Sequence, residues 1–372
     1  MATEREASRD EYFMSQALTL AHAGLETTHP NPRVGCVIVR DDAIVGRGAH
    51  RRVGGPHAEI EALAQAGSQA QGATVYVTLE PCAHEGRTPP CAPALVASGV
   101  ARVVYAVPDP NPLAAGGGRI LMQAGIEVSQ GPLSRSAREL NRGFFKRHET
   151  GWPWVTIKLA ASLDGRTALA SGASRWITGE AARKDVRRLR ARSSAVVTGS
   201  GTILSDNPLL SVRRAQGDDS GMEREPLRVV LDSRARCPPE AHVFQPVGEC
   251  LLVTGSGADT SSHERAGIPI TRVGMSASGL ALDEILALLG RRILNEILVE
   301  AGPTLSGAWI GEQLVDECWL YLAPSMLGAD ARPLVGLPVL ENLDQAPTWT
   351  IRDMRRVGDD LRLILRPVDR EH

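Results

Sequence analysis

The first third of the chain alternates short apolar runs with segments whose apolar residues recur at helical spacing. The apolar runs predict strands at residues 34–39, 74–79 and 102–107, and Val45, after the Asp41-Asp42 turn, predicts a strand that returns beside the first. The helical spacing predicts helices between the strands, the first of them beginning at a capping box made by Ser8 and Glu11. The amphipathic segment 134–146 predicts a closing helix. Strands separated by helices favour an α/β layered sandwich with a mostly parallel sheet.

A second series of apolar runs begins after residue 154. It predicts strands at residues 155–159, 195–198, 228–231, 251–253, 297–299 and 319–322, and helices at residues 180–190 and 282–289. The stretch 148–154, HETGWPW, mixes charge with glycine and proline, which is typical of a linker. The polar stretch 215–225 predicts an exposed loop. The pattern therefore predicts two consecutive α/β domains.

Composition narrows the partners that these domains can have. The 372 residues carry 41 Lys and Arg against 43 Asp and Glu, so no overall positive field exists to attract a polyanion. Aromatic residues make up 4% of the chain, which leaves few side chains to stack on bases. Both values argue against a nucleic acid partner.

Polar residues also interrupt every stretch that could lie in a bilayer. The longest stretch without a formal charge, residues 62–79, contains Gln, Ser and Thr and cannot span a membrane. The first residues lack the apolar core of a signal peptide, so we expect a cytoplasmic protein with reduced cysteines. Among the six cysteines only Cys82 and Cys91 are close in sequence, and such a pair favours a metal or catalytic site.

A zinc site is indicated by His57, Cys82 and Cys91, which offer one imidazole and two thiolates and leave a fourth position to water. Glu59 follows His57 by two residues, and at the first turn of a helix both side chains can reach a metal over the helix end. These residues and Pro81 match parts of the zinc nucleobase deaminase signature, in which the glutamate shuttles protons. The match is imperfect, because eight residues separate the two cysteines where the signature has two.

A closed site is the alternative. If His84 joined as a fourth ligand, the zinc would be structural. Glu59 would then be only a carboxylate at a helix start.

The second half has no G-x-G-x-x-G after a predicted strand, which argues against a Rossmann dinucleotide site. The run 297–299 leads into residues 300–307, EAGPTLSG, a glycine-containing turn from a strand to a helix. Such a turn can point backbone N–H groups at a phosphate, and it can equally serve only to reverse the chain.

Several longer segments are similar to one enzyme family. They are THPNPRVGCVIV (28–39), GGPHAEIEAL (54–63), YVTLEPCAHEGRTPPC (76–91), DPNP (109–112), KLAASLDGRTA (158–168), SRWIT (174–178), TGSGTILSDNPLLSVR (198–213), LDS (231–233) and VEAGPTLSGAWI (299–310). In these segments the chain resembles the bifunctional riboflavin-biosynthesis deaminase/reductase family, of which the wide cysteine spacing is a trait. The resemblance implies a cytidine-deaminase-like α/β/α sandwich at residues 1–148 and a dihydrofolate-reductase-like α/β domain at residues 153–370.

The resemblance also implies a reaction sequence. The first domain would carry out zinc-dependent hydrolytic deamination of 2,5-diamino-6-ribosylamino-4(3H)-pyrimidinone 5′-phosphate. The second would use NADPH to reduce the ribosyl group, which gives 5-amino-6-ribitylaminouracil 5′-phosphate. We therefore expect a small-molecule pyrimidine ribosylamine phosphate as partner, neither nucleic acid nor membrane, and a homo-oligomer. The choice of NADPH over NADH follows from the resemblance alone.

Site residues are implied by motif position. Glu59 is the catalytic residue, and the zinc ligands are His57, Cys82 and Cys91. The residues that would contact NADPH are Ala160, Trp176, Thr202, Asp206, Ser233, Gly302, Pro303, Thr304, Leu305, Ser306, Gly307 and Ala308. Those that would contact the reductase substrate are Ser174, Arg190, Leu210, Arg213 and Glu300. The deaminase pocket would include Asn31, His50, His84 and Arg87, with Arg87 near the phosphate.

Simpler interpretations compete with these roles. From residue types alone, Asn31 could as well be a turn residue between two prolines as a pocket residue. The same evidence favours Trp176 as a core residue over a cofactor contact. Most charges of the basic run 183–192 would lie on a solvated helix face, with Arg190 as the exception. Two other functions also stay open: a nucleic-acid editing deaminase with a C-terminal binding module, and an inactive protein whose zinc supports folding.

Overall fold

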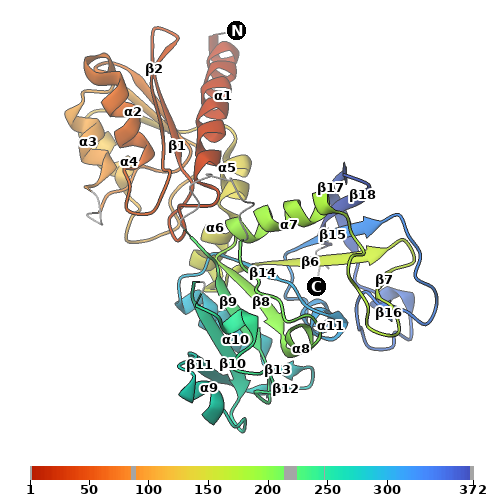
Figure 1. Cartoon of the computed structure of the whole chain (residues 1–372). Coiled ribbons are helices and arrows are strands. Elements are labelled where there is room, and N and C mark those ends of the chain that lie inside the picture. The colour runs from red at the N-terminus through yellow and green to blue at the C-terminus, as the bar shows by residue number, and fades with distance from the viewer. Residues whose placement is uncertain (1, 85–88, 213–223, 247, 369–372) are drawn as a thin grey trace. The chain divides into compact units, whose positions relative to one another are not determined.

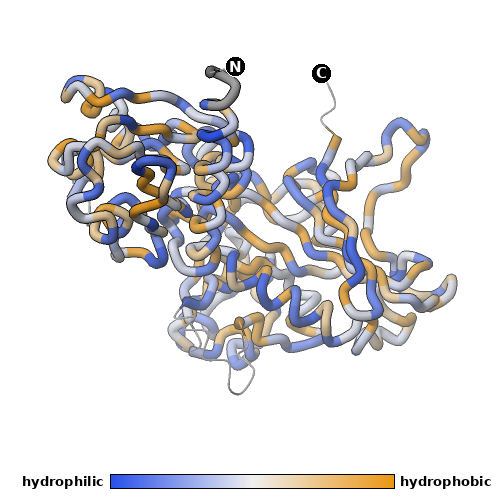
Figure 2. Tube along the Cα trace, turned by 90° about the horizontal axis from the view of Figure 1, so that it is seen from above, coloured by the Kyte–Doolittle hydropathy of each residue, from blue (hydrophilic) through white to orange (hydrophobic). Residues whose placement is uncertain are grey.

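The computed structural model describes residues 2–84, 89–212, 224–246 and 248–368. The chain divides into two compact units, residues 1–151 and 152–372, each with its own sheet (Figure 1). Apolar runs form orange stretches of the tube inside each unit (Figure 2). Within the described ranges, none of the helices has the length and apolar character needed to cross a membrane.

The sheet of unit 1 has the strand order β2-β1-β3-β4-β5. The strands are β1 (Gly35–Arg40), β2 (Ala43–Ala49), β3 (Thr74–Val77), β4 (Arg102–Tyr105) and β5 (Glu127–Gln130). β3, β4 and β5 are parallel, but β1 runs antiparallel to both of its neighbours. The sheet is therefore mixed rather than mostly parallel. The cause is the two-residue turn Asp41-Asp42, with φ of 50° and 59°, which returns the chain directly as a hairpin.

Helices cover both faces of this sheet (Figure 1). The described helices are α1 (Ala2–Ala21), η1 (His22–Gly24), α2 (Ala58–Ala66), η2 (Gly67–Ala70), α3 (Cys91–Ala97), α4 (Gly117–Gln123), α5 (Ser134–Leu140) and α6 (Arg142–Thr150). A Cβ on Gly35 would lie 2.0 Å from the carbonyl of Ala17 in α1, and one on Gly48 would lie 1.9 Å from that of Ala58 in α2. Glycine thus lets one helix approach each face, which gives an α/β/α sandwich.

Two helix boundaries differ from the sequence prediction. The capping box at Ser8 and Glu11 is wrong, because α1 begins at Ala2 and both residues lie inside it. The predicted helix 134–146 is two helices that meet at Asn141. The Asn141 side chain accepts a hydrogen bond from the Arg33 N–H at 2.7 Å and donates one to the Arg33 carbonyl at 2.9 Å. A tertiary contact that periodicity does not encode therefore accompanies the break.

In the described part of unit 2 the main sheet has the strand order β11-β10-β9-β8-β14-β6-β15-β18-β17. Its strands are β6 (Trp154–Ser162), β8 (Ala195–Gly199), β9 (Leu227–Leu231), β10 (Cys250–Gly255), β11 (Ile270–Val273), β14 (Glu296–Val299), β15 (Glu317–Ala323), β17 (Trp349–Val357) and β18 (Asp360–Pro367). The strands from β11 to β15 are parallel, as the alternation with helices predicts, whereas β18 and β17 are antiparallel. The β17–β18 hairpin was missed by the sequence prediction.

The remaining elements of unit 2 connect these strands. The helices are α7 (Glu180–Arg192), α8 (Ser200–Asp206), η3 (His242–Phe244), α9 (Ser261–Arg265), α10 (Leu282–Arg291), α11 (Pro303–Gly311) and η4 (Leu343–Gln345). Short strand pairs are β7 (Arg166–Ala168) with β16 (Arg332–Pro333), and β12 (Met275–Ser276) with β13 (Gly279–Leu280). Because seven neighbouring strands are parallel, their carboxyl ends share one edge of the sheet. Ligands of open α/β sheets bind at that edge.

Candidate functional site

In unit 1, the donor atoms of His57, Cys82 and Cys91 all lie within 4.8 Å of one another. His57 is the N-cap residue of α2, and Cys91 is the first residue of α3. The His57 Nδ1 atom is 3.2 Å from the Cys91 Sγ atom and 3.5 Å from the Cys82 Sγ atom. The structure therefore brings together the three residues that sequence spacing selected.

A hydrogen bond between the two thiols shifts their pKa values in opposite directions. The hydrogen bond from Cys91 is the largest influence on Cys82, and it lowers the pKa of the Cys82 thiol to about 4, although burial opposes this. The same hydrogen bond, with burial, raises the pKa of Cys91. The Cys91 backbone N–H also points at the Cys82 sulfur, at 3.3 Å. The lowered pKa of Cys82 favours the thiolate form that binds a cation, and the imidazole and two sulfurs fit the ligand set of zinc.

Glu59 lies in the first turn of α2 and is only 3% exposed. Burial raises the pKa of the Glu59 carboxyl to about 7, and the charge of Cys82 acts in the same direction. A carboxyl whose pKa lies near neutrality can both take and return a proton. The arrangement is the one that proton shuttling beside a metal requires.

Two of the predicted pocket residues, Asn31 and His50, lie beside the three-donor group. The Asn31 side-chain nitrogen is 3.1 Å from His50 Nε2, and His50 Nδ1 is 2.9 Å from the Pro56 carbonyl. The His50 and His57 rings meet edge to face, with centroids 5.4 Å apart. Asn31 is a turn residue as well, because its N–H donates to the Thr28 carbonyl. The interpretation of Asn31 as a turn residue is thus confirmed, and its role in the pocket stays a prediction.

The other two predicted pocket residues lie on the loop between the cysteines. His84 is exposed and is not in the three-donor group, so in the described residues it does not close the site. Arg87 lies outside the described residues.

Glu80 was missed by the sequence prediction although it precedes Cys82 by two residues. Its carboxylate accepts hydrogen bonds from the N–H groups of Gly116 at 3.1 Å and Gly118 at 3.0 Å. A third comes from the Asp109 N–H at 3.3 Å. The DPNP segment and the start of α4 are thereby tied to the cysteine turn. The signal was present as an acid between the apolar end of a strand and Pro81.

In unit 2, Glu300 follows β14 and forms a bidentate ion pair with Arg190 of α7. The Arg190 Nη2 atom donates to Glu300 Oε2 at 2.8 Å, and its Nε atom donates to the other oxygen. The side chains are 17% and 11% exposed. Burial alone would raise the pKa of Glu300, but the charge and hydrogen bonds of Arg190 lower it, so the carboxylate stays ionised.

Lys158 of β6 interacts electrostatically with both members of this pair and was not singled out from the sequence. Burial lowers its pKa, the charge of Glu300 opposes that shift and the charge of Arg190 adds to it. Its signal was a lysine inside the otherwise apolar run of β6. The structure thus gathers two cations and one anion from α7, β6 and the end of β14.

The predicted anion-binding turn follows β14 directly. Gly302 is the N-cap of α11 and Pro303 its first residue, so the chain changes from strand to helix within this turn. A Cβ on Gly307 would lie 2.2 Å from the Gly336 carbonyl, so glycine is needed for that approach. The unpaired N–H groups of a helix start suit an anion here.

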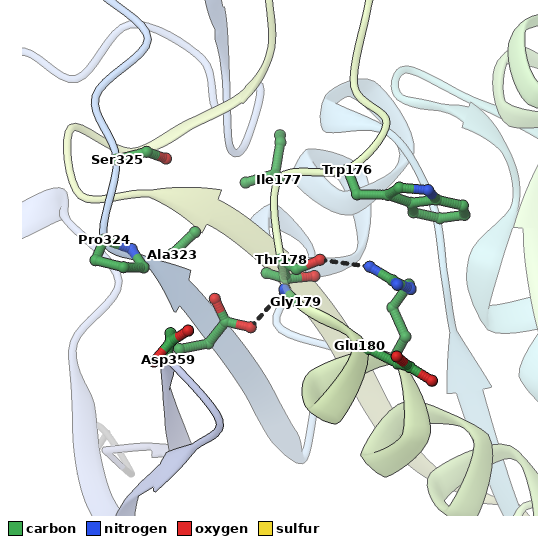
Figure 3. A pocket seen from close by; sticks show the side chains of 11 residues that line it. Trp176, Ile177, Thr178, Gly179, Glu180, Ala323, Pro324, Ser325 and Asp359 are labelled. Carbon is green, nitrogen blue, oxygen red and sulfur yellow. Dashed lines mark hydrogen bonds between the residues drawn. The ribbon is translucent and has the colours of Figure 1, made fainter.

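Trp176 is 68% exposed, so its interpretation as a core residue is wrong. Its ring stacks under the Arg183 guanidinium, 4.5 Å from the centroid. Figure 3 shows it beside a pocket of about 410 Å³ between the start of α7 and the end of β15. The Asp360 carboxylate accepts the Gly179 N–H at 2.8 Å there, so the start of α7 already holds an anion.

The other predicted reductase residues are spread along the carboxyl edge. Ala160 is in β6, Thr202 and Asp206 are in α8, and Ser233 is in the turn after β9. Ser174 lies in the loop before α7, and Leu210 is buried with φ of 56°. Arg213 and most of the predicted loop 215–225 lie outside the described residues.

Comparison with known proteins agrees with this geometry. Residues 7–107 match the family model described as the cytidine and deoxycytidylate deaminase zinc-binding region. Residues 153–363 match the RibD C-terminal domain. The first match covers all three zinc-type donors, and the second covers the Arg190–Glu300 pair.

Relatives resemble the chain over nearly its whole length. The riboflavin biosynthesis protein RibD of Escherichia coli is 49% identical and covers 96% of this chain and 99% of its own. The solved structure of Acinetobacter baumannii RibD has a TM-score of 0.91 at 45% identity, covering 98% of this chain and 100% of its own.

A third relative is the Thermotoga maritima diaminohydroxyphosphoribosylaminopyrimidine deaminase/5-amino-6-(5-phosphoribosylamino)uracil reductase. It has a TM-score of 0.85 at 31% identity, again covering 98% of this chain and 100% of its own. Both halves of the chain are thus matched in one continuous relative. The chain belongs to the RibD family of bifunctional deaminase/reductase enzymes of riboflavin biosynthesis.

Proposed function

We propose that unit 1 deaminates 2,5-diamino-6-ribosylamino-4(3H)-pyrimidinone 5′-phosphate and that unit 2 then reduces the ribosyl group to give 5-amino-6-ribitylaminouracil 5′-phosphate. The observation that carries the proposal is the three-donor group beside buried Glu59 in a chain that also matches the RibD C-terminal domain. The name of the Thermotoga maritima relative, a pyrimidine deaminase and uracil reductase, supports these substrates. We assign residues 1–148 to the deaminase domain and 153–370 to the reductase domain.

In the deaminase, His57, Cys82 and Cys91 would hold zinc, which would supply a water nucleophile at neutral pH. With zinc bound, Glu59 would pass one proton of the water to the ring nitrogen. It would then carry the second proton, from the hydroxyl added to the ring carbon, to the departing amine, so that ammonia leaves and a carbonyl remains. Its burial keeps bulk water from competing for the proton. Asn31 and His50 line the pocket next to the ligands.

In the reductase, NADPH supplies the hydride. The ribosylamine would open to an imine, and the reduction would add the hydride to its sugar carbon and a proton from solvent to its nitrogen. Arg190 holds Glu300 in place beside Lys158, and this charged group binds the open sugar chain. The turn from Gly302 to Ala308 binds the cofactor pyrophosphate at the start of α11.

We also propose a homo-oligomer located in the cytoplasm. β17 is a nine-residue edge strand in which Ile351 and Met354 are 58% and 62% exposed, and such an edge favours pairing with a second copy. All six cysteines are free, which is typical of a reducing compartment.

Both activities are tested on one preparation of the protein, whose zinc content is measured, with a separate substrate for each activity. Ammonia release is measured on the diaminopyrimidine phosphate, and NADPH oxidation on the product that has already been deaminated. A chelator should abolish ammonia release and leave NADPH oxidation intact. Simultaneous loss of both activities would contradict separate sites.

A further inference from the structure

The turn after β9, residues 232–237 with the sequence DSRARC, combines a buried acid with two exposed arginines. Asp232 is 0% exposed. One of its oxygens accepts the Cys237 N–H at 2.7 Å, and the other accepts the Arg234 N–H at 3.3 Å. In dinucleotide sites an acid after a strand binds the hydroxyl groups of the adenosine ribose. Here that acid is buried, and each of its oxygens already accepts an N–H group of its own turn.

The arginines of the same turn face outward. The Arg236 side chain is 55% exposed, and its Nε atom lies 3.7 Å from Asp232 Oδ1. Its Nη2 atom donates to the Ser200 hydroxyl at 3.0 Å, at the start of α8. The guanidinium therefore bridges the ends of β8 and β9, and further N–H groups of its five stay available to a ligand. Arg234 is exposed two residues before it.

The strand order places the turn 232–237 at the same edge of the sheet as the turn 302–308, which we assign to the cofactor pyrophosphate. β14, β8 and β9 are neighbours, so the turns that begin at Gly302, Ser200 and Ser233 follow one another along the carboxyl edge. Strands lie about 4.8 Å apart, so β9 is about 10 Å from β14. An adenosine ribose attached to a pyrophosphate at Gly302 can reach that far.

We propose that Arg236, assisted by Arg234, binds the 2′-phosphate of the adenosine ribose and makes the reductase selective for NADPH over NADH. This inference rests on the proposed function of unit 2. A phosphate dianion receives charge-assisted hydrogen bonds from the guanidinium groups, whereas a free 2′-hydroxyl finds an acid that is already occupied. The same turn thus attracts the 2′-phosphate of NADPH through its arginines and offers no free carboxylate to the 2′-hydroxyl of NADH.

The experiment compares Arg236→Ala, Arg236→Lys and Arg234→Ala in the full chain. For Arg236→Ala, kcat/KM with NADPH should fall by about 10- to 100-fold, the loss expected for charge-assisted hydrogen bonds, while kcat/KM with NADH stays within about twofold. Arg234→Ala should lower the NADPH value by about two- to fivefold. Arg236→Lys keeps the charge but loses the planar fork, so it should lie between wild type and alanine.

Calorimetric titration with adenosine 2′,5′-bisphosphate gives a second readout that needs no turnover. Arg236→Ala should weaken the binding of this probe and leave the binding of adenosine 5′-monophosphate unchanged. Arg291→Ala is the matched control, since Arg291 is exposed at the end of α10 and that end leads into the amino end of β14.

An unchanged NADPH to NADH ratio in both alanine variants would overturn the inference. An equal loss with both cofactors would overturn it too, because Arg236 would then only support the turn. Failure of the proposed function looks different: the wild-type chain would oxidise neither cofactor with the deaminated substrate, while the bisphosphate titration would still report on Arg236.

Discussion

The zinc-type group of unit 1 and the charged group of unit 2 differ in how their negative charge is neutralised. In unit 1, the donor atoms of two thiols and an imidazole lie within 4.8 Å of one another and interact with the buried acid Glu59, and this donor set suits a cation. In unit 2, the Glu300 carboxylate is neutralised by Arg190 from the chain itself. The first site therefore depends on a metal, and the second is organised without one.

The largest effect is expected for Cys91→Ala, which removes one of the three proposed zinc ligands. Ammonia release should fall by at least about a thousandfold, since the water nucleophile requires the metal. NADPH oxidation on the deaminated substrate should stay within about twofold, because unit 2 neutralises its own charges. Metal content by mass spectrometry should fall in parallel with ammonia release. Cys250→Ala, which removes a thiol from unit 2, is the control and should keep its zinc.

Glu300→Gln should damage unit 2 alone. It leaves the buried Arg190 charge without its partner, and breaking such a pair costs about 3–5 kcal/mol of unfolding free energy. Two-transition chemical denaturation should show the loss in one transition only, together with loss of NADPH oxidation. Glu240→Gln, at an exposed acid in the same unit, should leave both transitions in place. A loss shared equally by both transitions would mean that the units do not unfold separately.

Asp10→Asn tests whether unit 1 also contains a self-neutralised group away from the metal ligands. Tyr76 donates to Asp10 at 2.7 Å, and Arg102 forms a bidentate pair with it at 2.9 and 2.8 Å. The change should cost about 2–3 kcal/mol of unfolding free energy, because Arg102 loses its charged acceptor. Zinc content should not change. Glu11→Gln, at the next residue of α1 and exposed, is the matched control.

The smallest effect concerns pH. Burial, and then the charge of Arg147, lowers the pKa of His148 to about 4 from 6.5. The unfolded chain therefore binds a proton more readily than the folded one, and this contribution to stability is present above pH 6.5 and is lost as pH falls toward 4. Because the ring is only half-buried, the slope should be below about 1 kcal/mol per pH unit. Denaturation of His148→Gln between pH 7 and pH 5 should lack this slope; an unchanged slope would contradict it.

The two sites also differ in how well the sequence predicts them. The zinc-type group follows from two short segments, because a first helical turn and a cysteine turn fix their donors locally. Glu59 is next to His57 in space for the same reason. Glu80 was missed because its role is to bind backbone N–H groups of a distant loop, and no spacing encodes that.

In unit 2 the site is assembled from the ends of separate strands. Periodicity predicted those strands, but their order in the sheet comes from packing, so the meeting of Arg190 with Glu300 rested on family resemblance alone. Lys158 sits in an apolar run that is consistent with a buried strand, and only the structure shows that it interacts with Glu300. The β17–β18 hairpin was missed because its exposed, charged outer strand lacks an apolar run.

The most direct measurement is the activity of Glu59→Gln on both substrates, with zinc determined on the same sample. Because the amide keeps the shape of the carboxyl but cannot carry the proton, ammonia release should fall by about 10²–10⁴-fold. Zinc content and NADPH oxidation should equal those of the wild type. Undiminished ammonia release from zinc-loaded Glu59→Gln would contradict the account.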